Sequence, residues 1–240
     1  VLVLSAQRSS ERCVALLLSL SRFFSATPPL ESLRILLRLA SSRKDYVLGF
    51  DDGKLSNLQT LAPGGNGLGF GARHVDFSKQ YCFVSIERQN AIGVYRLEAA
   101  GRLSAEPLFI KNALVDPDAK SKYPGQGAGP IHVHPNGRFV YQTNRGSGTV
   151  DHNGQRVSNG GENNIVVWRI NPATGEPTRI QNIDTHGYET RTFVITPDGK
   201  TMIVAETLAL RLTAFDVAAD GSLSNRRVWA DLSAHMAAPD

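Results

Sequence analysis

The chain has 240 residues, of which 41 % are hydrophobic and 20 % charged, as is usual for a soluble globular protein that buries a core. Residues 1–50 carry seven Lys or Arg against three Asp or Glu, and so account for the whole net charge of +4. The remaining chain is balanced, which argues against a basic nucleic-acid-binding face. Cys13 and Cys82 lie far apart in the sequence and form neither a zinc motif nor a disulfide framework.

Residues 1–45 differ from the rest, because they are rich in Leu, Ser and Arg and space their apolar residues as a helix does. We expect one or two amphipathic helices there, packed on the following domain or on a partner chain. The first apolar run is too short to span a membrane and is interrupted by Arg22. A secretory signal is the alternative for this run. We expect a cytoplasmic protein, with the periplasm or secretion left open.

From residue 46 to residue 240 the pattern is that of β-strands. Three copies of one motif read HVDFSKQYCFVSIE, IHVHPNGRFVYQTN and FVITPDGKTMIVAE, and each is followed by a third alternating strand and a shorter fourth one. These units span residues 73–111, 129–185 and 191–232. Four antiparallel strands that recur in this way are typical of a β-propeller blade. The predicted fold is all-β, a partial or small propeller of about three to five blades with a short helical N-terminal segment.

Three units and a fragment do not close a ring, since closed propellers use roughly four to eight blades. Open strand edges are normally covered or paired. We therefore expect either a homo-oligomer or covering of an edge by residues 1–45. Two Gly-rich stretches, residues 113–129 and 145–163, interrupt the repeat; they are predicted either to line a pocket mouth or to form plain surface loops.

The segments GARHVDF with VSIERQNAIGVYRLE, and GPIHVHPNGRFVYQTNRG with NNIVVWRINPATGEP, resemble the lactonase family of seven-bladed propellers. That family includes the bacterial propeller-type 6-phosphogluconolactonase and the carboxymuconate lactonizing enzyme. The stretch from Thr196 to Leu232 looks instead like the gluconolactonase/regucalcin family, whose six-bladed propellers hydrolyse sugar lactones with a divalent metal, often calcium. Both resemblances imply a small lactone as the substrate.

Alignment of the repeats on their turns places Arg73, Gly129 and Arg191 at one equivalent position, where the innermost strand enters the central channel. A guanidinium is always charged and offers a planar fork of donors. It therefore suits a lactone carbonyl whose oxygen becomes anionic during attack, or a substrate carboxylate or phosphate. The structural alternative is that these arginines pair with neighbouring carboxylates such as Glu87 or Glu189.

A base is needed to take a proton from the attacking water. His74 follows Arg73, while His132 and His134 alternate along one strand and face the same way. Because His134 directly precedes a turn, we expect it to be exposed and prefer His132. Glu87 and Glu189 are the carboxylate candidates, and the resemblance implies that Glu87 orients Arg73.

The resemblance to gluconolactonases further implies a divalent cation such as Ca²⁺, for which Asp240 of the terminal Pro-Asp is the ligand candidate. The hypothesis is a bacterial lactonase that opens a sugar lactone, or an acyl-homoserine lactone as in quorum quenching. The alternative is a propeller binding module that has lost this chemistry, since Pro130 stands where the lactonase pattern usually has Glu. An isomerase of the muconate-cyclase type is the third reading.

Overall fold

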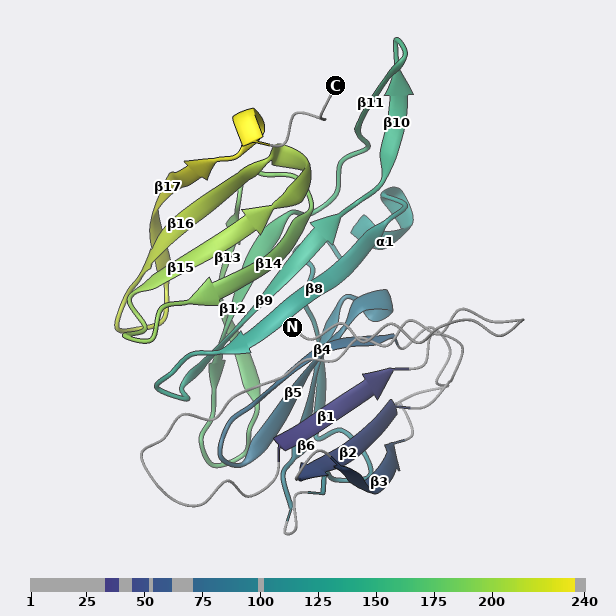
Figure 1. Cartoon of the computed structure of the whole chain (residues 1–240), viewed down its shortest axis with the longest axis vertical. Coiled ribbons are helices and arrows are strands. Elements are labelled where there is room, and N and C mark those ends of the chain that lie inside the picture. The colour runs from purple at the N-terminus through teal and green to yellow at the C-terminus, as the bar shows by residue number, and fades with distance from the viewer. Residues whose placement is uncertain (1–32, 39–44, 52–53, 62–70, 99–101, 236–240) are drawn as a thin grey trace, which may run out of the picture.

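The structure is a computed structural model that describes residues 33–38, 45–51, 54–61, 71–98 and 102–235. Nearly all of the elements in these ranges are strands (Figure 1). The helical turns are α1 (Ala119–Lys122), η1 (Glu87–Gln89), η3 (Thr207–Ala209) and η4 (Ser233–His235). None of the helices in the described ranges has the length and apolar character needed to cross a membrane.

Three four-stranded antiparallel sheets form the body of the described chain. The first contains β4 (Ala72–Phe77), β5 (Tyr81–Ile86), β6 (Ala91–Arg96) and β7 (Phe109–Asn112). The second contains β8 (Gln126–Val133), β9 (Phe139–Gly146), β12 (Asn164–Ile170) and β13 (Pro177–Asp184). The third contains β14 (Thr190–Ile195), β15 (Thr201–Glu206), β16 (Arg211–Val217) and β17 (Leu223–Asp231).

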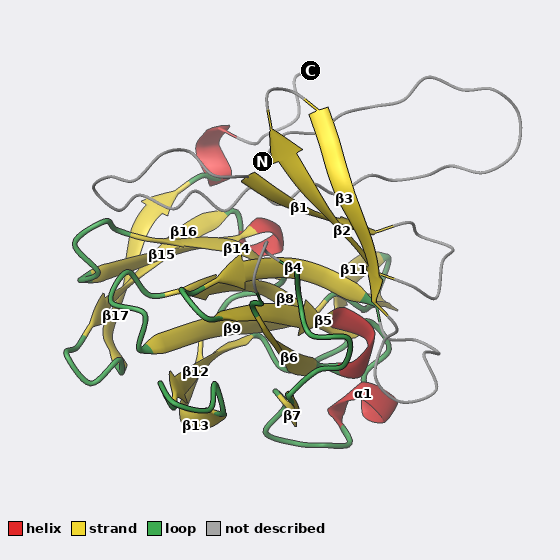
Figure 2. Cartoon of the chain, turned by 90° about the horizontal axis from the view of Figure 1, so that it is seen from below, coloured by secondary structure: helices red, strands yellow, loops and turns green. Residues whose placement is uncertain are grey.

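Each sheet is a propeller blade, because its strands follow one another in sequence from the inside outwards. The innermost strands β4, β8 and β14 lie next to one another (Figures 1 and 2). The three predicted units and the all-β propeller class are thereby confirmed.

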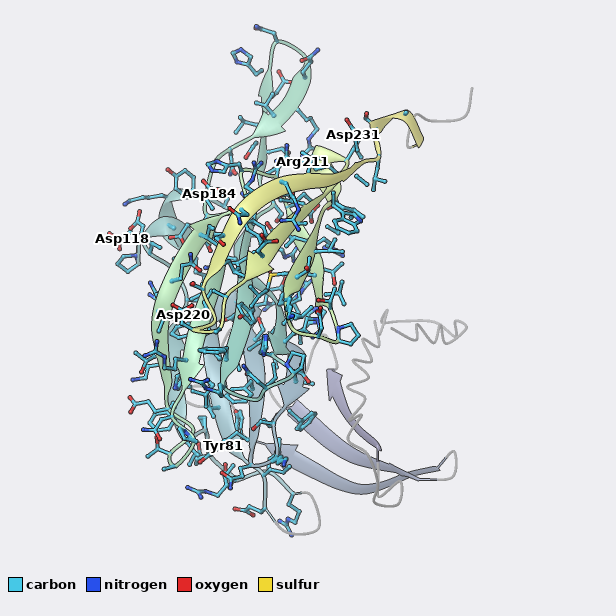
Figure 3. The ribbon with its side chains drawn as sticks, turned by 90° about the vertical axis from the view of Figure 1, so that its left-hand side faces the viewer. Tyr81, Asp118, Asp184, Arg211, Asp220 and Asp231 are labelled. Atoms are coloured by element: carbon cyan, nitrogen blue, oxygen red, sulfur yellow. The ribbon has the colours of Figure 1, made fainter. Side chains whose placement is uncertain are left out.

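Successive blades stack face to face through their alternating side chains. In β5, Cys82 and Val84 point to one face of the first blade, whereas Tyr81 and Phe83 point to the other, where they meet Ile131 of the second blade. A further apolar layer joins the second and third blades, and its members are Phe139, Tyr141, Ile165, Val167, Phe193, Met202, Val204, Phe215 and Leu223. Figure 3 shows the side chains along the strands of the three blades. This packing fixes the angle between the blades, and so the convergence of their inner strands.

The turn from the first to the second strand has the same geometry in the second and third blades. Gly137 and Gly199 both have a φ of +72°, which a residue with a side chain rarely adopts. Contrary to expectation, His134 before the first of these turns is buried, at 9 % exposure. Its Nε2 lies 2.9 Å from the carbonyl oxygen of Gly199, so that it joins the two turns.

The expected N-terminal helices are wrong for residues 33–38, which form strand β1 (Leu33–Arg38). This strand pairs antiparallel with β2 (Asp45–Asp51), and β2 pairs with β3 (Lys54–Leu61), in a three-stranded sheet. A six-residue segment with four apolar residues fits a helix or a strand, and pairing with β2 decides the outcome here. The other predicted helical residues lie outside the described part of the chain.

Within residues 145–163, β10 (Thr149–His152) and β11 (Gln155–Ser158) form a separate hairpin. The hairpin stands away from the blades, at the top of Figure 1. Most of its residues are exposed. Of the two alternatives predicted for residues 145–163, a surface loop therefore describes the β10–β11 hairpin.

Candidate functional site

A β-bulge interrupts the innermost strand of each blade at one equivalent place. In β4 the register passes from Ala72 to His74 and leaves Arg73 as the extra residue, and in β14 the extra residue is Arg191. The bulge of β8 contains Gly129 and Pro130. The alignment of Arg73, Gly129 and Arg191 made from the sequence is therefore confirmed by the pairing of the strands. A bulge redirects a side chain out of the regular alternation.

The side chains at these bulges belong to one continuous chain of ion pairs. Arg73 Nη1 lies 2.7 Å from Glu87 Oε1, and Arg145 Nη2 lies 2.5 Å from the same oxygen. The other end of Arg145, Nη1, is 3.0 Å from Glu189 Oε1, which is 3.4 Å from Arg191 Nη1. We call these five residues the arginine–glutamate row. It runs across all three blades where their inner strands converge.

The ends of the second strands supply further members of this cluster. Glu87, Arg145 and Thr207 each follow the residue that pairs with the strand position just before the bulge (Ile86, Asn144 and Glu206), so they are equivalent positions. Arg145 provides a guanidinium in the blade whose bulge has Gly129 in place of arginine. Thr207, the equivalent residue of the third blade, also contacts the row, since its Oγ1 donates a hydrogen bond of 2.9 Å to Glu189 Oε2.

Burial divides the row into a fixed part and an accessible part. The side chains of Arg73 and Arg145 are 10 % and 11 % exposed, whereas that of Arg191 is 49 % exposed. Burial lowers the pKa of the Arg73 guanidinium, Glu87 raises it, and the charges of Arg145 and Arg191 lower it further. Three guanidinium groups against two carboxylates leave the row with an excess of one positive charge. It can therefore receive a negative group, and Arg191 is its accessible end.

Two histidines and an aspartate lie on the inner strands β4 and β8, and His74 interacts electrostatically with Arg73, Glu87 and Arg145 of the row. Burial, followed by the charges of Arg73 and His132, lowers the pKa of His74 to about 3, so this imidazole is neutral near pH 7. His132 Nδ1 lies 3.5 Å from Asp76 Oδ2. The His132 ring also meets the Phe193 ring edge to face, with centroids 4.8 Å apart.

The residues predicted as a site come from strands β4, β8 and β14, from the turn η1 and from the loop before β14. They are Arg73, His74, Glu87, His132, Glu189 and Arg191. The ion pairs Arg73–Glu87 and Arg191–Glu189 also agree with the alternative given above, in which these arginines only pair with neighbouring carboxylates. Reasoning from the sequence missed Arg145 and Asp76. The equivalence of Arg145 to Glu87 in the repeat could have revealed the first; Asp76 had no such signal.

The predicted metal ligand, Asp240, lies outside the described residues. In the described ranges, no three His, Cys, Asp or Glu side chains form a group that could hold a metal ion. The two glutamates of the row are engaged by guanidinium groups, which compete directly with a cation for the same oxygens. These residues do not fit a calcium site, for which several free oxygen ligands are needed.

Comparison with known proteins gives a consistent result. A family model described as "Lactonase, 7-bladed beta-propeller" matches residues 45–233, which include the C-terminal stretch that looks like regucalcin. The 6-phosphogluconolactonase of Formosa agariphila is 31 % identical over 121 residues, 49 % of this chain and 31 % of that protein. The 6-phosphogluconolactonase of Erwinia tasmaniensis is 26 % identical over 62 % of this chain and 39 % of its own length.

Solved structures agree on the fold. A protein from Lactobacillus plantarum superposes with a TM-score of 0.66 at 25 % identity, over 83 % of this chain and 53 % of its own. The periplasmic gluconolactonase PpgL of Pseudomonas aeruginosa superposes with a TM-score of 0.61 at 21 % identity, over 82 % of this chain and 54 % of its own. The chain thus spans about half the length of these structures, and under two fifths of the curated relatives given above.

Proposed function

Since the chain belongs to the lactonase family of seven-bladed β-propellers, we propose that it hydrolyses the ester bond of a sugar lactone. The observation that carries this proposal is the arginine–glutamate row, which sets three guanidinium groups across the converging inner strands. Hydrolysis of a lactone places a negative charge on its carbonyl oxygen, and fixed positive donors stabilise such a charge. The relatives called 6-phosphogluconolactonase support a sugar lactone as the substrate.

The burial of the three arginines suggests separate roles. Arg191 is half exposed and its Nη1 donates to Glu189 Oε1 only across the long distance of 3.4 Å, so its guanidinium can turn to the lactone carbonyl. Arg145 is held between Glu87 and Glu189, Arg73 is paired with Glu87, and both arginines are nearly covered. They keep Glu87 and Glu189 in place and contribute positive potential from behind.

The reaction needs no group beyond the lactone, water and a base. The water oxygen attacks the carbonyl carbon while one of its protons passes to the base, and the carbonyl oxygen becomes anionic beside Arg191. When the intermediate collapses, the ring C–O bond breaks, and the ring oxygen takes the proton back and becomes a hydroxyl group. The product is a hydroxy acid, which releases one proton at neutral pH.

That proton makes the proposal directly testable by pH-stat titration. The substrates are glucono-lactone, 6-phosphogluconolactone and an acyl-homoserine lactone, each with and without a chelator. We expect turnover of a sugar lactone, and a loss of about 10²-fold or more in kcat/KM for Arg191→Ala. Arg227→Ala is the matched control, because Arg227 is a half-exposed arginine of the same blade paired with Asp216 at 2.6 Å. Equal activity in both variants would contradict the role of Arg191.

The chelator distinguishes a metal-dependent reaction from the one described here, and the third substrate tests quorum-signal hydrolysis. A binding module without turnover is the alternative function. Engagement of both glutamates by arginines favours this alternative, because neither carboxylate is then free to act as a base. Lactone binding by calorimetry without any proton release would support it.

A further inference from the structure

We infer that Asp76 is a positioning residue, which holds the His132 imidazole so that its Nε2 can act as the base of the proposed hydrolysis. This inference rests on the proposed function. Its structural part, the fixed orientation of His132 by Asp76, can be tested without any substrate.

The Asp76 carboxylate is itself held rigidly. Its Oδ1 accepts the backbone N–H of Phe77 at 2.8 Å, and its Oδ2 accepts the backbone N–H of Val133 at 2.8 Å. The second bond crosses from the first blade to the second. Oδ2 therefore has a fixed position beside the strand that carries His132, and its side chain is only 17 % exposed.

His132 sits between this carboxylate and an aromatic ring. Its Nδ1 faces Asp76 Oδ2 at 3.5 Å, and Phe193 of the third blade meets its ring at an interplanar angle of 85°. A carboxylate on the Nδ1 side favours the tautomer with the proton on Nδ1. The lone pair is then on Nε2, at the opposite side of the ring. Since the side chain is 39 % exposed, a water molecule can reach it.

The other candidates for the base are less suited to it. Glu87 and Glu189 each accept two guanidinium groups in the arginine–glutamate row, so their carboxylates are already engaged by fixed partners. His74 is neutral, but its pKa of about 3 makes it a poor proton acceptor. His134 is buried and bonds to the backbone of Gly199. His132 combines access to water with a carboxylate at its other nitrogen.

Asp76 also has a purely structural role, as a tie between β4 and β8, so the test must separate the two. Asp76→Asn retains the size of the side chain, but an amide can accept only one of the two backbone N–H groups. A matched control is Asp184→Asn. Asp184, labelled in Figure 3, also faces a histidine, since its Oδ2 lies 3.8 Å from His186 Nδ1, but both side chains are about two-thirds exposed.

The first measurement is the tautomer of His132, read from the ¹⁵N shifts of its ring in the wild-type protein. We expect the proton on Nδ1, and a shift toward a mixture of tautomers in Asp76→Asn but not in Asp184→Asn. A wild-type ring protonated on Nε2 would overturn the inference, whether or not the protein hydrolyses lactones. The tautomer of the wild-type ring can be read without any variant.

The second measurement is the lactone kinetics of His132→Gln, Asp76→Asn and the double variant. We expect kcat to fall by about 10²-fold for His132→Gln and about tenfold for Asp76→Asn, with KM little changed. The double variant should be no slower than His132→Gln alone, because Asp76 acts through His132. Losses that multiply would show that Asp76 acts only on the structure. If the wild-type protein is inactive but shows the expected tautomer, the proposed function is wrong, while the orientation of His132 by Asp76 is still supported.

Discussion

Arg73 and Arg191 stand at the same place in two different blades, each as the extra residue of a bulge in the innermost strand. Arg145 links them through Glu87 and Glu189, so one row of charges ties three sheets together. The same β-bulge in two blades thus brings side chains from separate sheets into one row of ion pairs.

Arg145 should be the residue of the row on which stability depends most. Arg145→Ala leaves the Glu87 and Glu189 carboxylates partly buried without their shared partner, and it should lower the free energy of unfolding by about 3–5 kcal/mol. Arg227→Ala removes an exposed ion pair and should cost about 0–1 kcal/mol. Urea unfolding followed by circular dichroism measures both; similar losses would show that the row carries no special stability.

Gly129 should tolerate no side chain, in contrast to the equivalent Arg73 and Arg191. A Cβ at this position would lie 2.1 Å from Thr143 Oγ1. Gly129→Ala should therefore destabilise the protein by about 1–3 kcal/mol, and Thr143→Ala in the same chain should restore part of the loss. Denaturant unfolding of the two single variants and the double variant gives the coupling; strictly additive losses would show that the two residues do not clash.

His74 should make the protein sensitive to acid. As pH falls below the usual value of 6.5, the unfolded chain binds a proton at His74, whereas the folded protein does so only near its pKa of about 3. The unfolded state then binds more protons, so the free energy of unfolding falls between pH 6.5 and 3, by up to about 1.4 kcal/mol per pH unit.

Urea unfolding at several pH values in this window measures the effect. His74→Gln should flatten the slope, and His152→Gln, on the exposed β10–β11 hairpin, should leave it unchanged. An equal slope in wild type and His74→Gln would contradict the burial of a neutral imidazole.

The open face of the third blade should promote self-association. Asp76, His132 and Val194 occupy equivalent places in β4, β8 and β14, and the first two meet the following blade. Val194 is 56 % exposed and meets no such blade within the described residues. Proteins normally cover such a face.

Sedimentation velocity over a range of concentrations tests this expectation. Val194→Lys should weaken association, whereas Val115→Lys should not, although Val115 is similarly exposed at 60 %. A wild-type chain that remains monomeric at all concentrations would contradict self-association through this face.

The repeat was the part of the fold that the sequence could predict, because each blade carries its own strand alternation and turn. The equivalence of Arg73 and Arg191 followed from that repeat. The strand at residues 33–38 could not be predicted, since its conformation depends on pairing with β2 and not on its own periodicity. Turn position suggested that His134 is exposed, but contact with Gly199 of the next blade buries it.

The candidate site, like the fold, could be predicted only where it depends on the repeat. Asp76 lies within the first copy of the repeat motif but was not recognised, because its role depends on a hydrogen bond to Val133 in another blade. Arg145 occupies the position of Glu87 in the repeat, but its pairing could not be predicted, because its partners Glu87 and Glu189 lie 58 and 44 residues away in the sequence. Contacts between blades depend on how the sheets are stacked, and no local pattern records them.

The central claim is that the accessible end of the arginine–glutamate row acts on a lactone. The most direct test is the rate of proton release from a sugar lactone by the wild type, Arg191→Ala and Arg227→Ala at one pH. We predict clear turnover by the wild type and Arg227→Ala, and a loss of about 10²-fold for Arg191→Ala. An Arg191→Ala rate equal to that of the wild type, or a wild type without turnover, would contradict the account.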